Sequence, residues 1–243
     1  MLASAAAIYG VSASSAFAVA HVDLAGIRWS DEAEVRARLA APAGANLFRV
    51  ATEPLEARLR ELPTVASASV TARLPGTLEV RVEERTPVLV WKVGERRYLV
   101  DGDGTLFAEL PTRPGRDADT LPVVEDRRRV SARLGVGAAL DPVDRDAATR
   151  LASLRAVDVG SAAAGLAIEV TDIHGFVVRA RPSGWQAVFG FYTPSLRTPD
   201  MVPAQVRLLR SLLLEHGEGN VQQVILASET EGTFTTPPPS ATP

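Results

Sequence analysis

The stretch LPGTLEVRVEERTP, residues 74–87, decides the fold of the first part of this 243-residue chain. It opens with Leu-Pro-Gly, a composition typical of turns. The residues that follow alternate strictly: Leu78, Val80 and Val82 are apolar, and the residues between them are charged. Alternation with a period of two indicates a strand with one buried face. The stretch therefore predicts a turn that leads into a half-buried strand.

The residues before this strand predict the rest of a small α/β module. Residues 65–73 alternate as a second strand. A helix is expected after Ser30, a plausible N-cap followed by acidic residues, and another after Thr52, a second candidate cap. Residues 17–26 read as a first strand that ends at a glycine. The predicted order over residues 17–84 is strand, helix, helix, strand, strand.

Residues 85–236 predict a larger, β-rich domain. Short apolar runs separated by turn residues are typical of strands. One helix is expected after Asp141, a candidate N-cap, and another over residues 203–215. The expected strands lie around 88–93, 96–100, 106–107, 121–124, 166–170, 176–180, 185–190, 221–227 and 232–236. We therefore predict an α+β chain whose second domain is a mixed sheet with flanking helices.

The two ends of the chain differ from its middle. Residues 1–22 contain no Asp, Glu, Lys or Arg, and residues 1–16 are apolar and rich in alanine and serine. Three interpretations are open: part of a transmembrane helix, a signal peptide cleaved near residues 16–18, or a buried helix. At the other end, the Pro-rich residues 237–243 predict a disordered tail.

Composition excludes several kinds of chemistry. The net charge of −3 argues against a nucleic-acid partner. The sequence contains no cysteine, and Lys92 is its single lysine, so thiol chemistry and a Lys-containing phosphate loop are absent. The Asp101–Gly104 segment predicts a hairpin turn rather than a calcium loop. We expect no catalytic, cofactor-binding or metal-binding residue, no cofactor and no small-molecule substrate, although a carboxylate pair for hydrolysis stays open.

Two polar segments have simple interpretations. The run Arg127–Arg129 is expected to be a solvated surface, with contact to anionic lipid as the alternative. His174 lies in a segment that predicts a hairpin turn between two strands, and we interpret it as an exposed turn residue.

An ordered set of motifs runs through about seventy residues and continues to Trp91. These motifs are Phe17-x-Val19-x-x-Val22-x-Leu24-x-Gly26, Gly44-x-Asn46-Leu47-Phe48, Leu62-Pro63-x-Val65 and Val70-x-x-x-Leu74-Pro75-x-Thr77-Leu78-x-Val80-x-Val82-x-Glu84-Arg85-x-Pro87. The set resembles the POTRA domain of the FtsQ/DivIB family of bacterial cell-division proteins. Residues 98–104 are similar to the start of that family's β domain. A lysine usually opens the family's last helix, and none is present near residues 202–205, which puts any contact of that lysine in doubt.

The resemblance implies four parts and a function by binding. The parts are a partial transmembrane helix (1–16), a POTRA domain (17–84), an FtsQ-like β domain (85–236) and the tail (237–243). The implied function is a non-enzymatic divisome scaffold at the septum, held in the cell membrane by a single pass with its bulk outside the cytoplasm. The POTRA domain would contact other divisome proteins.

The resemblance also places an FtsB–FtsL-type partner on the β domain. A last strand followed by a proline-rich tail leaves a sheet edge that can accept another strand. Two alternatives remain: a POTRA-bearing transport or outer-membrane assembly protein, and a secreted hydrolase. The residues expected to bind the FtsB-like partner are Val224, Ile225, Leu226, Ala227, Gly232, Thr233, Phe234, Thr235 and Thr236.

Overall fold

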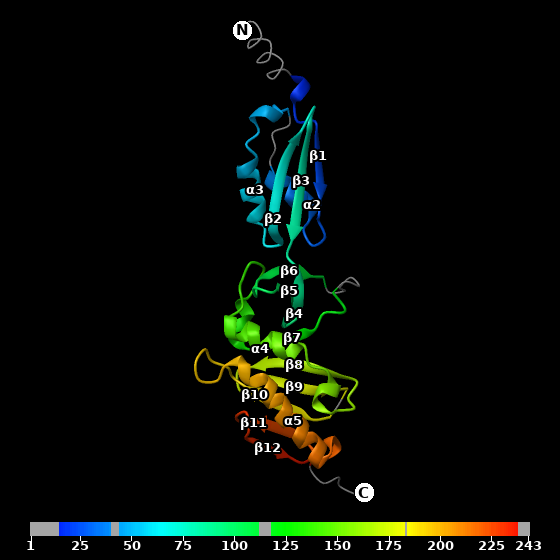
Figure 1. Ribbon diagram of the computed structural model, residues 1–243, viewed down its shortest axis with the longest axis vertical. Coiled ribbons are helices and arrows are strands. Elements are labelled where there is room, and N and C mark those ends of the chain that lie inside the picture. The colour runs from blue at the N-terminus through cyan, green and yellow to red at the C-terminus, as the bar shows by residue number, and fades with distance from the viewer. Residues whose placement is uncertain (1–14, 40–43, 112–117, 183, 238–243) are drawn as a thin grey trace. The chain divides into compact units, whose positions relative to one another are not determined.

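The computed structural model describes residues 15–39, 44–111, 118–182 and 184–237. Two compact units make up the chain, one up to Thr86 and one from Pro87 (Figure 1). The expectations for residues 1–14 and 238–243 lie outside the described residues. Among the described residues, no helix combines the length and apolar composition needed to cross a membrane.

The first unit has the predicted element order. A short 3-10 helix, η1 (Ser15–Phe17), precedes β1 (His21–Ala25), α2 (Glu32–Leu39), η2 (Leu47–Arg49), α3 (Thr52–Arg60), β2 (Val65–Arg73) and β3 (Thr77–Glu84). The strand order is β1-β3-β2, with β3 parallel to β1 and antiparallel to β2.

The alternation of β3 is confirmed, because Leu78, Val80 and Val82 are buried against the apolar faces of α2 and α3. The expected strand from Phe17 is wrong at its start. The backbone N–H of Val19 donates to the carbonyl of Ala45, and the N–H of Ala20 donates to the carbonyl of Gly76. These residues therefore bond to a loop and a turn rather than to a neighbouring strand.

Glu84, at the end of β3, fastens the loop that enters α2. Its carboxylate accepts the backbone N–H groups of Arg28, Trp29 and Ser30 at 2.9, 2.6 and 2.8 Å. Hydrogen bonds to a carboxylate are stronger than those between neutral groups. One side chain therefore ties the connection after β1 to the carboxyl end of the central strand, which lies at the same end of the sheet.

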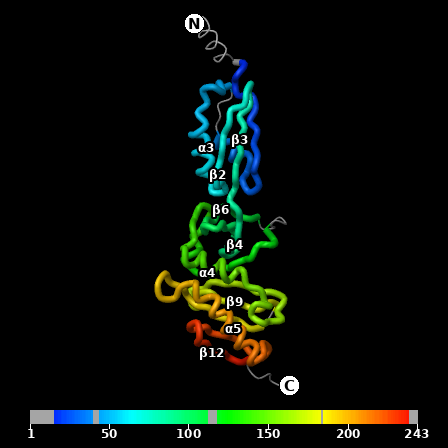
Figure 2. Tube along the Cα trace, in the orientation of Figure 1, coloured from blue at the N-terminus to red at the C-terminus, as the bar shows by residue number. Residues whose placement is uncertain are grey.

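The second unit is a nine-stranded sheet with helices on one face (Figures 1 and 2). Its order is β12-β11-β10-β9-β8-β7-β4-β5-β6. The helices α4 (Pro142–Ala152) and α5 (Val202–His216) bury Leu151, Leu209 and Leu213 in one apolar core with the strands. The strands are β4 (Pro87–Val93), β5 (Arg96–Asp101), β6 (Leu106–Leu110), β7 (Val123–Asp126), β8 (Gly165–Thr171), β9 (Gly175–Arg181), β10 (Gln186–Gly190), β11 (Gln223–Leu226) and β12 (Gly232–Thr235).

Local sequence explains two boundaries in this unit. Asp141 caps α4, because its carboxylate accepts the backbone N–H of Val143 at 2.9 Å. Gly175 opens β9 with a φ of +63°, and a Cβ atom there would lie 2.3 Å from the carbonyl oxygen of Gly190. Only glycine fits this close approach of two backbones. Gly94 has a similar φ of +59°, but a Cβ atom at that position would meet no other atom within 4 Å.

Candidate partner-binding edge

The candidate site is the edge of the large sheet at the end of the chain. β12 runs antiparallel to β11, with Val224 opposite Phe234 and Ile225 opposite Thr233. β11 in turn runs parallel to β10. Within the described residues, β12 has a strand neighbour on one side only. An edge strand presents unpaired backbone donors and acceptors, which are the groups that bind an added strand.

The helix α5 supports the inner face of this edge. Phe234 stacks on His216, the last residue of α5, with ring centroids 4.2 Å apart and planes at 29°. A Cβ atom at Gly232 would lie 3.3 Å from the side chains of Leu208 and Leu212 on α5. This close packing holds β12 against the helix while its outer backbone edge stays uncovered by the described chain.

The structure divides the predicted binding residues into three groups. Val224 and Leu226 are buried in the core, and Phe234 packs partly against it. Ile225 points to the opposite face and is 43% exposed. The remaining members are exposed or half-buried and lie on β12 or beside it: Ala227, Gly232, Thr233, Thr235 and Thr236.

A buried polar network at the carboxyl ends of β10 and β11 was missed by sequence reasoning. The side-chain amide of Gln205, fully buried on α5, donates to the carbonyls of Phe189 and Leu226 at 3.2 Å each. Arg197 donates to the same two carbonyls at 2.7 Å each. Its other amino group donates to the next carbonyl, that of Ala227. The network therefore fixes the end of β11, from which the chain turns back into β12.

The hydroxyl of Tyr192 completes the network by donating to Gln205 at 2.7 Å. Burial raises the pKa of Tyr192, and the nearby positive charge of Arg197 only partly opposes this. The signal in the sequence was the position of Gln205, a polar residue on the apolar face that Val202 and Leu209 define. A buried polar side chain of this kind needs partners.

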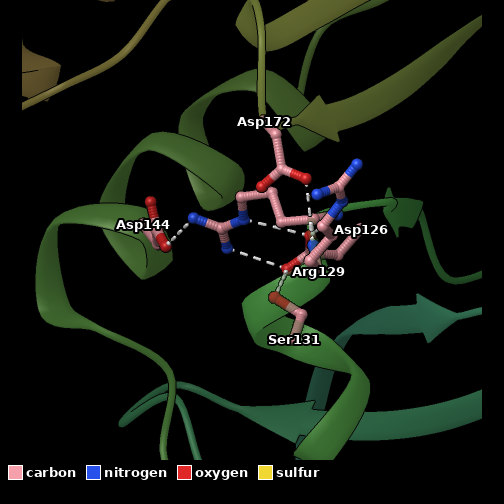
Figure 3. A network of polar contacts seen from close by, with 6 residues as sticks. Asp126, Arg129, Ser131, Asp144 and Asp172 are labelled. Atoms are coloured by element: carbon pink, nitrogen blue, oxygen red, sulfur yellow. Dashed lines mark hydrogen bonds and ion pairs between the residues drawn. The ribbon is translucent and has the colours of Figure 1, made fainter.

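A second polar cluster lies beside α4 (Figure 3). Asp126, at the end of β7, accepts hydrogen bonds from Ser131 at 2.6 Å and from the guanidinium of Arg128 at 2.8 and 3.0 Å. Arg128 also pairs with Asp144 of α4 at 2.6 Å. The expectation of a solvated Arg127–Arg129 run is wrong for Arg128, whose side chain is only 16% exposed.

Two carboxylates in this cluster share one guanidinium. Burial opposes the charged form of Arg128, but the hydrogen bonds and negative charges of Asp126 and Asp144 outweigh it and raise the pKa of the guanidinium. Burial raises the pKa of Asp144, against the lowering effect of Arg128. A serine beside two aspartates resembles a catalytic set in composition, but the ion pairs here tie β7 to α4.

The other residues considered in the sequence analysis, Asp101, Lys92 and His174, lie in turns or ion pairs. The carboxylate of Asp101 accepts the backbone N–H groups of Asp103 and Thr105 at 3.0 and 2.8 Å, as in a hairpin turn. The amino group Nζ of Lys92 forms an ion pair with Oε1 of Glu125 at 3.6 Å. His174 is an exposed turn residue between β8 and β9. The described part of the chain contains no group of three His, Cys, Asp or Glu residues placed to hold a metal ion.

Glu218, just after α5, binds the loop before β8. The hydroxyl of Ser161 and the backbone N–H of Ala162 donate to its carboxylate, the second at 3.2 Å. The hydrogen bond from Ser161 is the main reason why the pKa of Glu218 is lowered.

The comparison with known families identifies the first unit. Residues 17–85 match the family model of the POTRA domain, FtsQ-type. The fold defines a class of protein in which such a domain precedes a large, helix-backed sheet.

Individual relatives make the similarity more specific. The chain is 33% identical over 129 residues to the cell division protein FtsQ of Mycobacteroides abscessus, which is 53% of this chain and 41% of that protein. It is 36% identical over 133 residues to FtsQ of Streptomyces collinus (54% and 47%) and 35% over 141 residues to FtsQ of Streptomyces coelicolor (52% and 53%). The matches thus span about half the length of these relatives. The resemblance to FtsQ/DivIB-type proteins is confirmed.

Proposed function

We propose that the protein is a divisome scaffold that works by binding rather than by catalysis. It would link early division proteins to an FtsB–FtsL-type complex that controls septal peptidoglycan synthesis. Residues 1–16 would be part of the transmembrane anchor that holds the chain in the cell membrane at the septum, with both described units outside the cytoplasm. The POTRA domain would contact other divisome proteins. The similarity to FtsQ proteins over residues 17–85 and beyond supports this function.

The edge strand β12 is the observation that carries the proposed binding site. It is the last strand of the sheet, it is four residues long, and it has one strand neighbour among the described residues. Its threonines are exposed, while Phe234 and α5 hold it in place from the inner side. A partner segment in extended conformation can pair with its backbone and place side chains against Ile225 and Phe234.

Hydrogen exchange tests this site directly. An FtsB-like coiled-coil partner is added to the 243-residue chain, and amide exchange is followed by mass spectrometry. Strand addition predicts slower exchange over residues 232–235, because newly paired amides are protected. The opposite edge strand, β6, is the internal control and should exchange at an unchanged rate. Equal protection of both edges, or of neither, would contradict a binding site at β12.

A truncated chain gives an independent measurement. A chain that ends at Glu229 lacks β12, and its capture of the partner should be lost while far-UV circular dichroism still reports a folded sheet. Undiminished capture would contradict a binding site at β12 and would mean that the partner binds elsewhere on the domain. Turnover of peptidoglycan by the purified chain would overturn the non-enzymatic role.

A further inference from the structure

Two exposed apolar side chains, Phe48 and Leu74, lie at the same end of the POTRA domain as the half-buried Phe17 (Figure 1). Phe48 is 56% exposed and Leu74 is 58% exposed. The ring of Phe48 packs edge-on against that of half-buried Phe17, with centroids 5.1 Å apart. We name Phe17, Phe48 and Leu74 the apolar tip. A group of exposed apolar side chains at one place is typical of a surface that contacts another protein or a membrane.

The three residues come from segments that the fold brings together. The backbone N–H of Val19 donates to Ala45, close to Phe48, and the N–H of Ala20 donates to Gly76, in the turn after Leu74; both distances are 2.8 Å. The strand β2 ends, β3 begins, and η1 leads into β1 at this same end of the unit (Figure 1). The apolar tip is therefore a fixed feature of the domain.

The sequence next to the tip indicates what covers it. Residues 1–22 contain no Asp, Glu, Lys or Arg side chain, and Phe17 directly follows the uncharged residues of the proposed anchor. The polar interface of a bilayer is roughly 5–8 Å deep on each side of its hydrocarbon core. The rings of Phe17 and Phe48 are 5.1 Å apart, so Phe48 would share this layer if Phe17 borders the anchor in it. Aromatic and aliphatic side chains are favoured at this level of a membrane.

We infer that Phe48 and Leu74, together with Phe17, rest in the interfacial layer of the bilayer that holds the anchor. The POTRA domain would then contact lipid through three side chains of its own in addition to the anchor. This inference rests on the proposed anchor. It assigns to the apolar tip a lipid partner, namely the headgroup and upper acyl region of a phospholipid bilayer.

Spin labels can measure the depth of the tip, because the sequence has no cysteine and accepts single labelling sites. Phe48→Cys and Leu74→Cys are each labelled with a nitroxide, and the full chain is reconstituted into phosphatidylcholine–phosphatidylglycerol vesicles. The matched control is Ala66→Cys, an exposed position near the start of β2, the strand that ends directly before Leu74. Position 66 is eight residues before Leu74, which places it roughly 26 Å from the tip at about 3.3 Å per residue of strand.

The ratio of collisions with oxygen to collisions with a water-soluble nickel chelate reports depth. We expect this ratio to be several-fold higher at positions 48 and 74 than at position 66. Labels at 48 and 74 that behave like the label at 66 would overturn the inference. Labels shielded from both reagents would also overturn it, because that result means that protein covers the tip. Far-UV circular dichroism of the three variants checks folding, and Leu74 tests the idea without disturbing the pair of phenylalanine rings.

Vesicle flotation separates this inference from the proposed anchor. A chain that does not float with the vesicles would contradict the inference and would show that residues 1–16 do not hold the chain to a bilayer. A chain that floats while its tip labels stay in water would contradict the inference alone and leave the anchor and the edge-strand site intact.

Discussion

Replacing Gln205 with leucine should destabilise the second unit out of proportion to the size of the change. The side-chain amide is fully buried, donates to Phe189 and Leu226, and accepts the hydroxyl of Tyr192. Leucine fills a similar volume without polar atoms. In the variant the carbonyls of Phe189 and Leu226 keep Arg197 as a donor. The hydroxyl of Tyr192 loses the side-chain oxygen of Gln205 that accepts its hydrogen bond.

The expected magnitude follows from these contacts. Leaving a buried hydroxyl without its partner costs about 1–3 kcal/mol, and the partly buried hydroxyl of Tyr192 falls in the lower part of this range. Each lost amide hydrogen bond costs about 0.5–1.5 kcal/mol. Since both carbonyls stay bonded to Arg197, we expect the free energy of unfolding to fall by about 2–3 kcal/mol. Tyr192→Phe leaves the amide oxygen of Gln205 short of a donor and should cost about 1–2 kcal/mol. The double variant should cost clearly less than the two single changes together, because it removes both partners of one bond.

Urea denaturation followed by tryptophan fluorescence measures these values. Trp91 and Trp185 lie in the second unit, so a Trp29→Phe background makes the signal specific for that unit. Gln222→Leu, the same change at an exposed position, is the matched control and should shift stability by less than about 0.5 kcal/mol. A Gln205→Leu variant as stable as this control, or a strictly additive cycle with Tyr192→Phe, would refute the network.

Three further measurements test other contacts. Gly175→Ala should lower the free energy of unfolding by about 2–4 kcal/mol, because the new Cβ atom meets a backbone carbonyl. Gly94→Ala should lower it by only about 1–2 kcal/mol, because the positive φ is the one source of strain there. Equal losses in thermal or chemical denaturation would contradict the steric reasoning. Glu84→Ala, which frees three backbone donors, should destabilise the POTRA domain by about 2–3 kcal/mol, and the same change at exposed Glu83 by less than about 1 kcal/mol. The lowered pKa of Glu218 stabilises the fold above the ordinary glutamate range, and this contribution is lost as the pH falls through the folded-state value. Stability should therefore drop less steeply between about pH 5 and pH 3 in Glu218→Gln than in the natural chain, and parallel pH profiles would argue against the bond.

The fold was predictable where its cause is local. The alternation around Val80 follows from the pleat of a strand, and Asp141 caps a helix through the next residues of its own chain. The end strands β11 and β12 also followed from pattern and turn residues. The candidate edge was expected because a proline-rich segment follows the last predicted strand, and proline does not pair inside a sheet.

The errors fall where distant residues compete with local pattern. Arg128 sits in a run of three arginines that looks solvated, but Asp126 and Asp144 converge on it from β7 and α4. Residues 17–20 have the composition of a strand, but a loop and a turn take their amides instead. The buried network of Gln205 likewise depends on carbonyls that meet only in the folded sheet. Spacing along a sequence contains no information on such convergence.

The length of β12 limits what strand addition alone can supply at the proposed site. Four residues offer at most about four outward backbone hydrogen bonds, which contribute about 2–6 kcal/mol in total. Association costs about 4–15 kcal/mol in lost translational and rotational freedom. A partner that only paired with the backbone of β12 would therefore bind weakly. Ile225, exposed on one face of the edge, and Phe234, half-buried against α5 on the other, are the apolar groups within reach. A stable complex thus requires a partner whose strand also buries apolar side chains against one of these two faces.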